Sequence, residues 1–242
     1  MILARLHPIR EAVRARPREI EWVLFDSNRT DRRLSELKAL CRSAGVSVRF
    51  GDRQALVRMG GAAQQGAVAR MAARGYLPEE EALAGPQGNR FLLVLDEVQD
   101  PHNFGAVLRV ADGAGARVVV PERGSAPLSE TVERTSAGAL ERVAVIRVKN
   151  LRRFLDHLKE QGFRVIGLDP SGGPIYGVDL TGDLALVVGG EGRGLRRLVR
   201  EGCDVLASLP MKGTVASLNV STATAAAAWE AIRQRDFSSE NT

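Results

Sequence analysis

Cysteine and histidine are scarce in this sequence: two cysteines, Cys41 and Cys203, and three histidines occur among 242 residues. The cysteines lie far apart and no CxxC pair occurs, so neither a disulfide framework nor a zinc site is indicated. No stretch approaches the ~18 consecutive apolar residues of a membrane span, and the N-terminal MILARLHPIR never builds an apolar signal core. We therefore expect a cytoplasmic globular protein that needs no metal and does not associate with a membrane.

Lysine is also scarce, because 30 of the 34 basic side chains are arginine. The net charge of +5 is unevenly placed: residues 1–76 hold 15 Lys and Arg against 7 Asp and Glu, whereas residues 90–242 hold 19 of each. Arginine grips phosphate through two donors and stacks on bases, so the basic first third favours a polyanionic partner. A GC-rich genome that encodes arginine for lysine on a solvated surface is the alternative interpretation of the charge alone.

Apolar periodicity is missing from residues 77–89, which contain two prolines and three consecutive glutamates and are predicted to be a linker. Residues 1–76 are typical of a small α/β domain. In residues 90–242, short apolar strands alternate with helices, which indicates a mainly parallel sheet covered on both faces. Ligands of such sheets bind at loops beyond the carboxyl ends of the strands, so the loops after Val98, Gly190 and Pro210 are the candidate sites.

The first of these loops opens the segment DPHNFGAVLRVADGAGA. Asn103 follows a strand and precedes an amphipathic run, so it can serve simply as a helix cap. Arg109 lies inside the apolar run AVLRVA, where it would need an anionic partner or an active site. Arg109 is therefore a candidate functional residue, although an exposed place on the helix would also explain it.

The second loop, GGEGRG, has four glycines in six residues, which lets its backbone approach a ligand closely. It does not fit a dinucleotide-binding fingerprint, because Leu195 stands where the third glycine belongs and no acidic residue ends a strand ~20 residues further on. A phosphate-binding GxxxxGK[ST] motif occurs nowhere in the chain. Glu191 within this loop is either a solvated acid or a hydrogen-bonded group that takes part in chemistry.

The third loop belongs to LPMKGTVASLNVSTATAAAA, where Ser217 and Asn219 stand at a predicted loop-to-helix junction. Both could be capping residues. Small side chains crowd the first half of the following helix, and they permit close approach of another backbone or of a ligand. Helix propensity alone would also explain the alanines.

Together NFGAVLR, GGEGRGL and LPMKGTVASLNVSTATA resemble, in order and spacing, the three motifs of the SpoU-type RNA 2′-O-ribose methyltransferases of the trefoil-knotted SPOUT class. The resemblance covers the whole chain. It implies an α/β fold in which residues 1–76 are an L30e-like RNA substrate-binding domain and residues 90–242 are a SPOUT catalytic domain with a mainly parallel sheet. The knot follows from the resemblance alone, because knots are nearly absent among protein folds. The segment LDEVQDPHNFGAVLRVADGAGARVVVP is especially similar to the bacterial enzymes that methylate a guanosine ribose in 23S rRNA.

The resemblance also implies roles for individual residues. The catalytic set comprises Asn103, Arg109, Glu191, Ser217 and Asn219. The pocket for the methyl donor, S-adenosylmethionine, is formed largely by backbone at Gly189, Gly190, Leu209, Met211 and Leu218. A guanidinium stays protonated, so we expect Arg109 to stabilise the developing alkoxide and hold a neighbouring phosphate while another group takes the proton. The family further implies a homodimer and no metal.

One departure from the family pattern bears on the RNA target. Close relatives tend to carry His-Gln-Gly where this chain has Gln64-Gln65-Gly66, and the first domain selects the RNA. Two alternatives to 23S rRNA methylation stay open: a tRNA ribose 2′-O-methyltransferase, and a non-catalytic relative that binds RNA. The basic first domain disfavours the former, since tRNA-directed relatives often lack it, and the complete catalytic set disfavours the latter.

Overall fold

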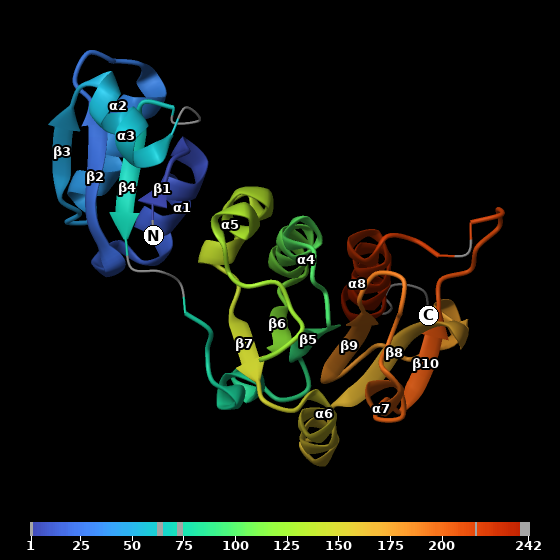
Figure 1. The fold of residues 1–242 in the computed structure, drawn as a ribbon. Coiled ribbons are helices and arrows are strands. Elements are labelled where there is room, and N and C mark those ends of the chain that lie inside the picture. Colours follow the sequence, from blue (N-terminus) through green and yellow to red (C-terminus); the bar gives the residue numbers. More distant parts are fainter. Residues whose placement is uncertain (1, 62–64, 72–74, 216, 238–242) are drawn as a thin grey trace. The chain divides into compact units, whose positions relative to one another are not determined.

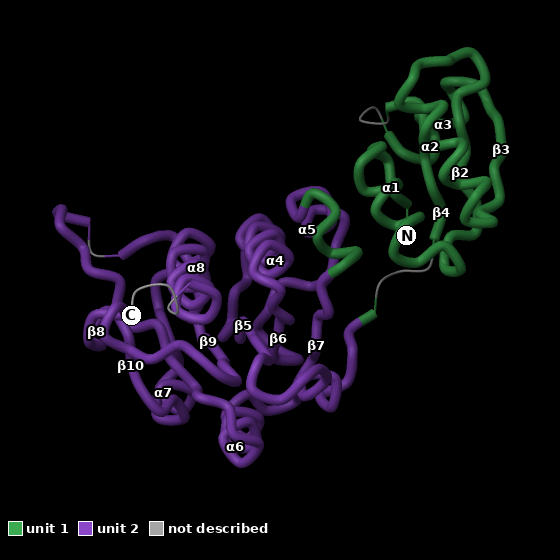
Figure 2. Tube along the Cα trace, turned by 180° about the vertical axis from the view of Figure 1, so that it is seen from behind, with its two compact units in different colours: residues 1–75, 137–142 green, residues 76–136, 143–242 purple. Residues whose placement is uncertain are grey.

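The chain forms two compact units in a computed structural model that describes residues 2–61, 65–71, 75–215 and 217–237. One unit comprises residues 1–75 and 137–142, and the other comprises residues 76–136 and 143–242 (Figures 1 and 2). Gln64, the residue that departs from the family pattern, lies outside the described residues.

The first unit is a four-stranded sheet with helices on both faces. Side chains of β2 alternate between these faces, as the two-residue period of a strand requires: Val23 and Phe25 join the core under α1 and α2, whereas Trp22 and Leu24 pack with Leu56 of α3. The strand order is β1-β4-β2-β3, with β2 and β3 parallel. The elements are β1 (Ile2–Leu3), α1 (Leu6–Ala15), the 3-10 helix η1 (Pro17–Glu19), β2 (Ile20–Asp26), α2 (Arg32–Ser43), β3 (Val48–Gly51), α3 (Arg53–Gly60), β4 (Ala67–Met71) and the 3-10 helix η3 (Ala139–Glu141).

The second unit is built on a six-stranded sheet in which every pairing is parallel, with strand order β10-β8-β9-β5-β6-β7. All these strands therefore end at one edge of the sheet. The elements are η2 (Glu79–Leu83), β5 (Phe91–Asp96), α4 (Pro101–Ala114), β6 (Arg117–Pro121), α5 (Glu130–Ser136), β7 (Val145–Val148), α6 (Leu151–Glu160), β8 (Arg164–Pro174), η4 (Ile175–Gly177), β9 (Leu184–Gly189), α7 (Arg197–Arg200), β10 (Val205–Ser208) and α8 (Val220–Phe237).

Helices cover both faces of this sheet, with α4, α5 and α8 on one side and α6 and α7 on the other (Figure 1). The central strands are apolar at consecutive positions because both faces are buried: each residue of β5 is buried, from Phe91 to Asp96. Alternate members of β5, Leu92 and Val94, pack with Phe154 and Leu155 of α6. The predicted alternation of strands and helices is thus the observed architecture.

The segment with the composition of a linker lies against the second unit. The backbone of Leu77 exchanges hydrogen bonds with β7, donating to Val145 at 2.8 Å and accepting from Arg147 at 3.0 Å. Ala82 of η2 is fully buried in the core beneath α6. The segment with the prolines and glutamates is therefore an ordered connection that packs against β7, the edge strand of the sheet.

The small residues of α8 allow it to lie close to α4. Thr224, Ala227 and Ala228 are fully buried, and Trp229 covers Gly113 of α4, where an added Cβ would stand 2.9 Å from the ring. A larger residue at these positions would push the two helices apart. Of the helices the structure describes, none combines the length and hydrophobicity that crossing a membrane requires.

Candidate active site

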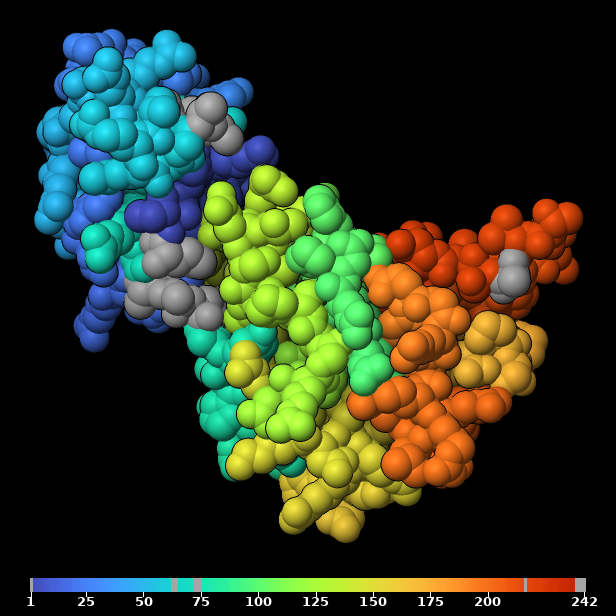
Figure 3. Space-filling view, in the orientation of Figure 1, coloured from blue at the N-terminus to red at the C-terminus, as the bar shows by residue number. Residues whose placement is uncertain are grey.

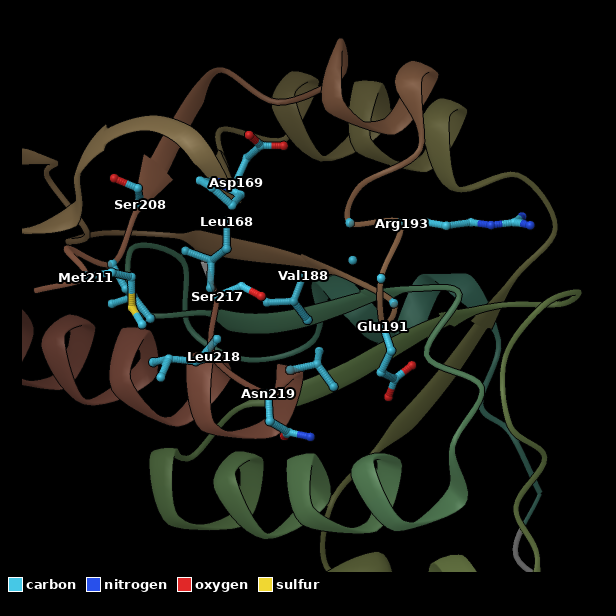
Figure 4. Close-up of a pocket in the computed structure, with 18 of the residues that line it drawn as sticks. Leu168, Asp169, Val188, Glu191, Arg193, Ser208, Met211, Ser217, Leu218 and Asn219 are labelled. Atoms are coloured by element: carbon cyan, nitrogen blue, oxygen red, sulfur yellow. The ribbon is translucent and has the colours of Figure 1, made fainter. Parts of the chain in front are cut away.

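The three candidate loops meet at the edge where the parallel strands end. The loops after β9 and β10 line a cavity of about 730 Å³, a size typical of small-molecule sites (Figure 4). Its walls come from the middle of β8, from the ends of β9 and β10 and the loops that follow them, and from the start of α8. Eight of the ten predicted site residues line it: Gly189, Gly190, Glu191, Leu209, Met211, Ser217, Leu218 and Asn219.

Asn103 joins two of the motifs through its side-chain amide. The amide N–H donates to the carboxylate of Glu191, and the amide oxygen accepts from the side chain of Asn219 at 3.0 Å. Figure 4 shows Glu191 and Asn219 pointing toward α4, the helix whose first turn carries Asn103. A neutral amide suits this place because it is both a donor and an acceptor. Asn103 thus holds the two cavity loops in register, although it does not itself line the cavity.

Asn219 has a second role at the beginning of α8. Its side-chain oxygen accepts from the backbone N–H of Ser221 at 2.9 Å and from the Ser221 hydroxyl at 2.6 Å. This is the local turn that asparagine forms before a helix. The capping role and the site role considered for Asn219 are therefore compatible, since the same side chain performs both.

The glycine loop after β9 is packed too tightly for larger residues. A Cβ on Gly189 would lie 2.0 Å from the backbone carbon of Gly194, and a Cβ on Gly190 would lie 2.3 Å from the carbonyl oxygen of Glu97. The Gly190 N–H donates to the Asp96 carbonyl at 2.8 Å. Backbone atoms therefore form this wall of the cavity.

A buried carboxylate that the sequence did not reveal supports this loop. Asp96, at the end of β5, is fully buried, and both of its carboxylate oxygens accept from Arg196: one from the backbone N–H at 2.8 Å, the other from Nε and Nη2 at 2.7 Å. Burial raises the pKa of Asp96 above its ordinary value, and the bonds from Arg196 oppose that rise. The only sequence signal was an acidic residue at a strand end, and the partner lies 100 residues away.

Asp169 is a second cavity carboxylate that the sequence did not reveal. Its oxygen accepts from the hydroxyl of Ser171 at 2.6 Å and from the Ser171 backbone N–H at 2.9 Å. Burial opposes its ionisation, but these bonds together with the charge of Arg200 lower the pKa of Asp169. The cavity therefore carries negative charge from Asp169 as well as Glu191.

Arg109 lies apart from this network. The helical period turns Val107, Leu108 and Ala111 of α4 inward and leaves Arg109 exposed. It is not among the residues that line the cavity, and within the described part of the chain it has no hydrogen-bond or ion-pair partner. Arg109 lies outside the apolar stripe of α4, so the expectation that it occupies an apolar face and needs an anionic neighbour is wrong.

The parallel sheet, the glycine-walled cavity at its carboxyl edge and the Asn103 link between the three polar motifs agree with the SPOUT fold that the motifs resemble. The sequence agrees: the chain belongs to the SpoU rRNA Methylase family, whose model matches residues 90–229. A second family model, described as RNA 2′-O ribose methyltransferase substrate binding, matches residues 6–77.

Curated relatives match along nearly the entire chain. The 23S rRNA (guanosine-2′-O-)-methyltransferase RlmB of Ralstonia nicotianae is 43% identical over 238 residues, which is 97% of this chain and 96% of the relative. The protein of that name from Escherichia coli K12 is 41% identical over 235 residues, which is 95% of this chain and 97% of the relative.

Solved structures confirm the predicted fold class. The SpoU methyltransferase AviRb from Streptomyces viridochromogenes, solved in complex with AdoMet, has a TM-score of 0.79 at 24% identity and covers 97% of this chain and 90% of its own. An AdoMet-bound rRNA methyltransferase from Sinorhizobium meliloti has a TM-score of 0.78 at 23% identity, covering 96% and 86%. The shared fold spans both units of the present chain.

Proposed function

We propose that this protein transfers a methyl group from S-adenosylmethionine to the ribose 2′-hydroxyl of a guanosine in 23S rRNA. One observation carries the assignment: Asn103 bonds to both Glu191 and Asn219 at the wall of the glycine cavity. These residues come from the three separate motifs, and their contact supports the catalytic set that the resemblance implies. The relatives named above support guanosine in 23S rRNA as the substrate.

The cavity has the chemistry to hold the methyl donor. Gly189 and Gly190 bring backbone without side chains to the wall of the cavity, while Leu209, Met211 and Leu218 offer an apolar surface. Met211 and Leu218 are 37% and 39% exposed, so bound donor would cover them. The carboxylate of Asp169 complements the positive charge of the donor.

The reaction requires an in-line approach of the ribose oxygen to the methyl carbon. The 2′-oxygen forms a bond to that carbon as the bond from carbon to sulfur breaks, and the hydroxyl proton leaves to a protein group or water. Arg109 would stabilise the negative charge that develops on the oxygen and hold a neighbouring phosphate. Asn103, Glu191, Ser217 and Asn219 would orient the nucleotide.

We propose a homodimer, and the place of Arg109 supports it. It is exposed on α4, and the neighbouring helix α8 exposes 51% of Trp229. Trp229 lies against Gly113, four residues after Arg109 on α4, so the exposed parts of these two helices form a surface that a second copy could cover. We propose that Arg109 reaches the cavity of the partner protomer across this surface, as the family implies.

Residues 1–76 would select the RNA. Their excess of basic over acidic side chains suits a phosphate backbone, and their family model carries the description of substrate binding. The tRNA alternative is less well supported: a structure titled for 2-OH methylation on tRNA covers only 62% of this chain, at 30% identity and a TM-score of 0.56.

Mapping ribose methylation across rRNA and tRNA, in cells with and without this gene, tests the proposal. We expect one 2′-O-methyl group on a guanosine of 23S rRNA to disappear, and to return with the wild-type gene but not with an Asn103→Ala variant. A missing methyl group on tRNA would transfer the assignment to the alternative substrate, and unchanged maps in both RNAs would refute methyl transfer.

A further inference from the structure

A second cavity lies at the same edge of the sheet as the proposed S-adenosylmethionine cavity, which we call the donor cavity. It measures about 580 Å³ and lies where β6 and β7 end. Five cationic side chains and one carboxylate are among its lining residues: Arg123, Lys149, Arg152, Arg196, Arg197 and Glu122. Residues 90–242 as a whole are balanced in charge, so this concentration is local.

The strands themselves place two of these cations side by side. Arg123 comes two residues after the end of β6 and Lys149 directly follows β7, and the backbone N–H of Glu122 donates to the carbonyl of Val148 at 2.8 Å. Both side chains are exposed, and within the described part of the chain neither has an ion-pair or hydrogen-bond partner. Two unpaired cations at a concave surface favour an anionic ligand.

The other cations are tied to the protein but still face this groove, which we define as the cavity lined by Arg123, Lys149, Arg152, Arg196 and Arg197. Arg152, whose side chain is 35% exposed, pairs with Asp156 at 3.1 Å, and the exposed Arg197 pairs with Glu201 at 2.8 Å. Exposed pairs of this kind are weak and exchange readily for a phosphate. Figure 3 shows the surfaces of α6 (yellow) and of the 190–200 segment (orange) side by side.

The groove is connected to the donor cavity by one loop. Glu191 lines the donor cavity, and Arg196, five residues later, lines the groove. Asp96 at the end of β5 bonds to Arg196 and so anchors the loop between the two. An RNA strand that places a ribose at Glu191 can therefore continue along the sheet edge with its phosphates over the cations. No comparable cluster of cations lines the donor cavity itself, among the residues described there.

We propose that this groove binds the phosphate backbone of the RNA substrate next to the nucleotide that is methylated. The inference rests on the proposed methyl transfer and adds a second RNA contact, on the catalytic unit, to the one expected of residues 1–76. The groove increases the affinity for RNA and positions the strand, but it does not select the base, because phosphate contacts carry no direct sequence information.

The test is a double substitution, Arg123→Gln with Lys149→Gln, in the full-length protein. The matched control is Arg164→Gln with Lys159→Gln, which removes the same two charges near the opposite edge of the sheet. Fluorescence anisotropy would measure binding of an unmodified 23S rRNA transcript and of a labelled oligouridylate between about 50 and 200 mM salt. Calorimetry with S-adenosylmethionine reports whether the donor cavity is intact.

We expect the groove variant to bind both RNAs roughly tenfold more weakly and its log-log salt slope to fall by about 1.4, since each single-strand phosphate contact contributes about 0.7. Donor affinity should match the wild type, and the control should retain wild-type RNA binding. Equal losses in the groove and control variants, or none in either, would overturn the proposal. The proposed function is judged separately, because a wild-type protein that transfers no methyl group contradicts it whatever the groove variants bind.

Discussion

The buried Asp96 carboxylate provides a sharp test of how the donor loop is held, through the substitution Asp96→Asn. Both oxygens of Asp96 accept from Arg196, one from the backbone N–H and one from the guanidinium. Asparagine keeps the shape but replaces one oxygen by an amino group. Whichever way the amide is turned, that amino group faces a donor of Arg196, so at least one N–H of Arg196 loses its partner.

The cost can be estimated from this geometry. An unsatisfied buried donor costs about 1–3 kcal/mol, and for a chain of this size 1 kcal/mol lowers Tm by about 2–4 °C. We therefore expect Asp96→Asn to lower Tm by roughly 3–10 °C. Donor affinity should also fall, because residues 188–194 form one wall of the cavity and Arg196 follows that segment two residues later.

Asp156→Asn is the matched control, because Asp156 pairs with Arg152 at the surface, at 3.1 Å and with 44% of its side chain exposed. Such exposed pairs contribute about 0–1 kcal/mol. Scanning calorimetry gives Tm for both variants, and titration calorimetry gives their affinity for S-adenosylmethionine. If Asp96→Asn matches the control in both measurements, the carboxylate does not position the loop.

Three further predictions concern other parts of the site and core. Arg109→Ala should reduce methyl transfer by at least about 100-fold, as loss of a charge-stabilising donor does, while S-adenosylmethionine binding persists; near-normal turnover refutes its catalytic role. Gly189→Ala should abolish donor binding in calorimetry, because the new Cβ would stand 2.0 Å from backbone, whereas Gly177→Ala, with nothing within 4 Å, should bind normally. Burial opposes ionisation of Asp183, but hydrogen bonds led by Arg90 outweigh it and hold its pKa at about 2. A lowered acid pKa stabilises the fold above the ordinary value of 3.8, so urea unfolding should lose about 2 kcal/mol between pH 4 and about pH 2, and an Asp183→Asn variant should lose less over that interval.

Much of the catalytic unit could be predicted because local patterns determine it. Consecutive apolar residues in β5 and helical spacing in α6 follow from burial on both faces of a parallel sheet. Since parallel strands end at one edge, the motif loops were expected to meet, and the bonds from Asn103 to Glu191 and Asn219 connect them. These features follow from the spacing of apolar residues and from the parallel direction of the strands, both of which can be inferred from a single sequence.

Pairings between distant residues could not be predicted in this way. Nothing in the sequence links Asp96 to an arginine 100 residues later, because the link depends on how the loop after β9 passes under the end of β5. The placement of Arg109 was misjudged for a related reason: its neighbours in the sequence are apolar, but a helix turns by about 100° per residue and exposes one position beside buried ones. Residues 77–89 likewise have a loop-like composition. The backbone of Leu77 nevertheless pairs with β7, which holds the segment against the sheet, and Ala82 is buried there.

The carboxyl edge of the sheet is divided by charge, and the division suits a reaction between a cation and a polyanion. The donor cavity is walled by glycine backbone and carries the carboxylates of Asp169 and Glu191, and its one arginine, Arg193, extends away from it (Figure 4). A sulfonium would be repelled by cations there, whereas a phosphate backbone is attracted by the groove beyond β5. Arg196 is bonded to Asp96 at the boundary between the cavity and the groove, so the loop that separates the two charged regions is also the one that, in the proposed function, holds the donor. The two substrates can therefore approach the same edge of one sheet, each from the side whose charge favours it.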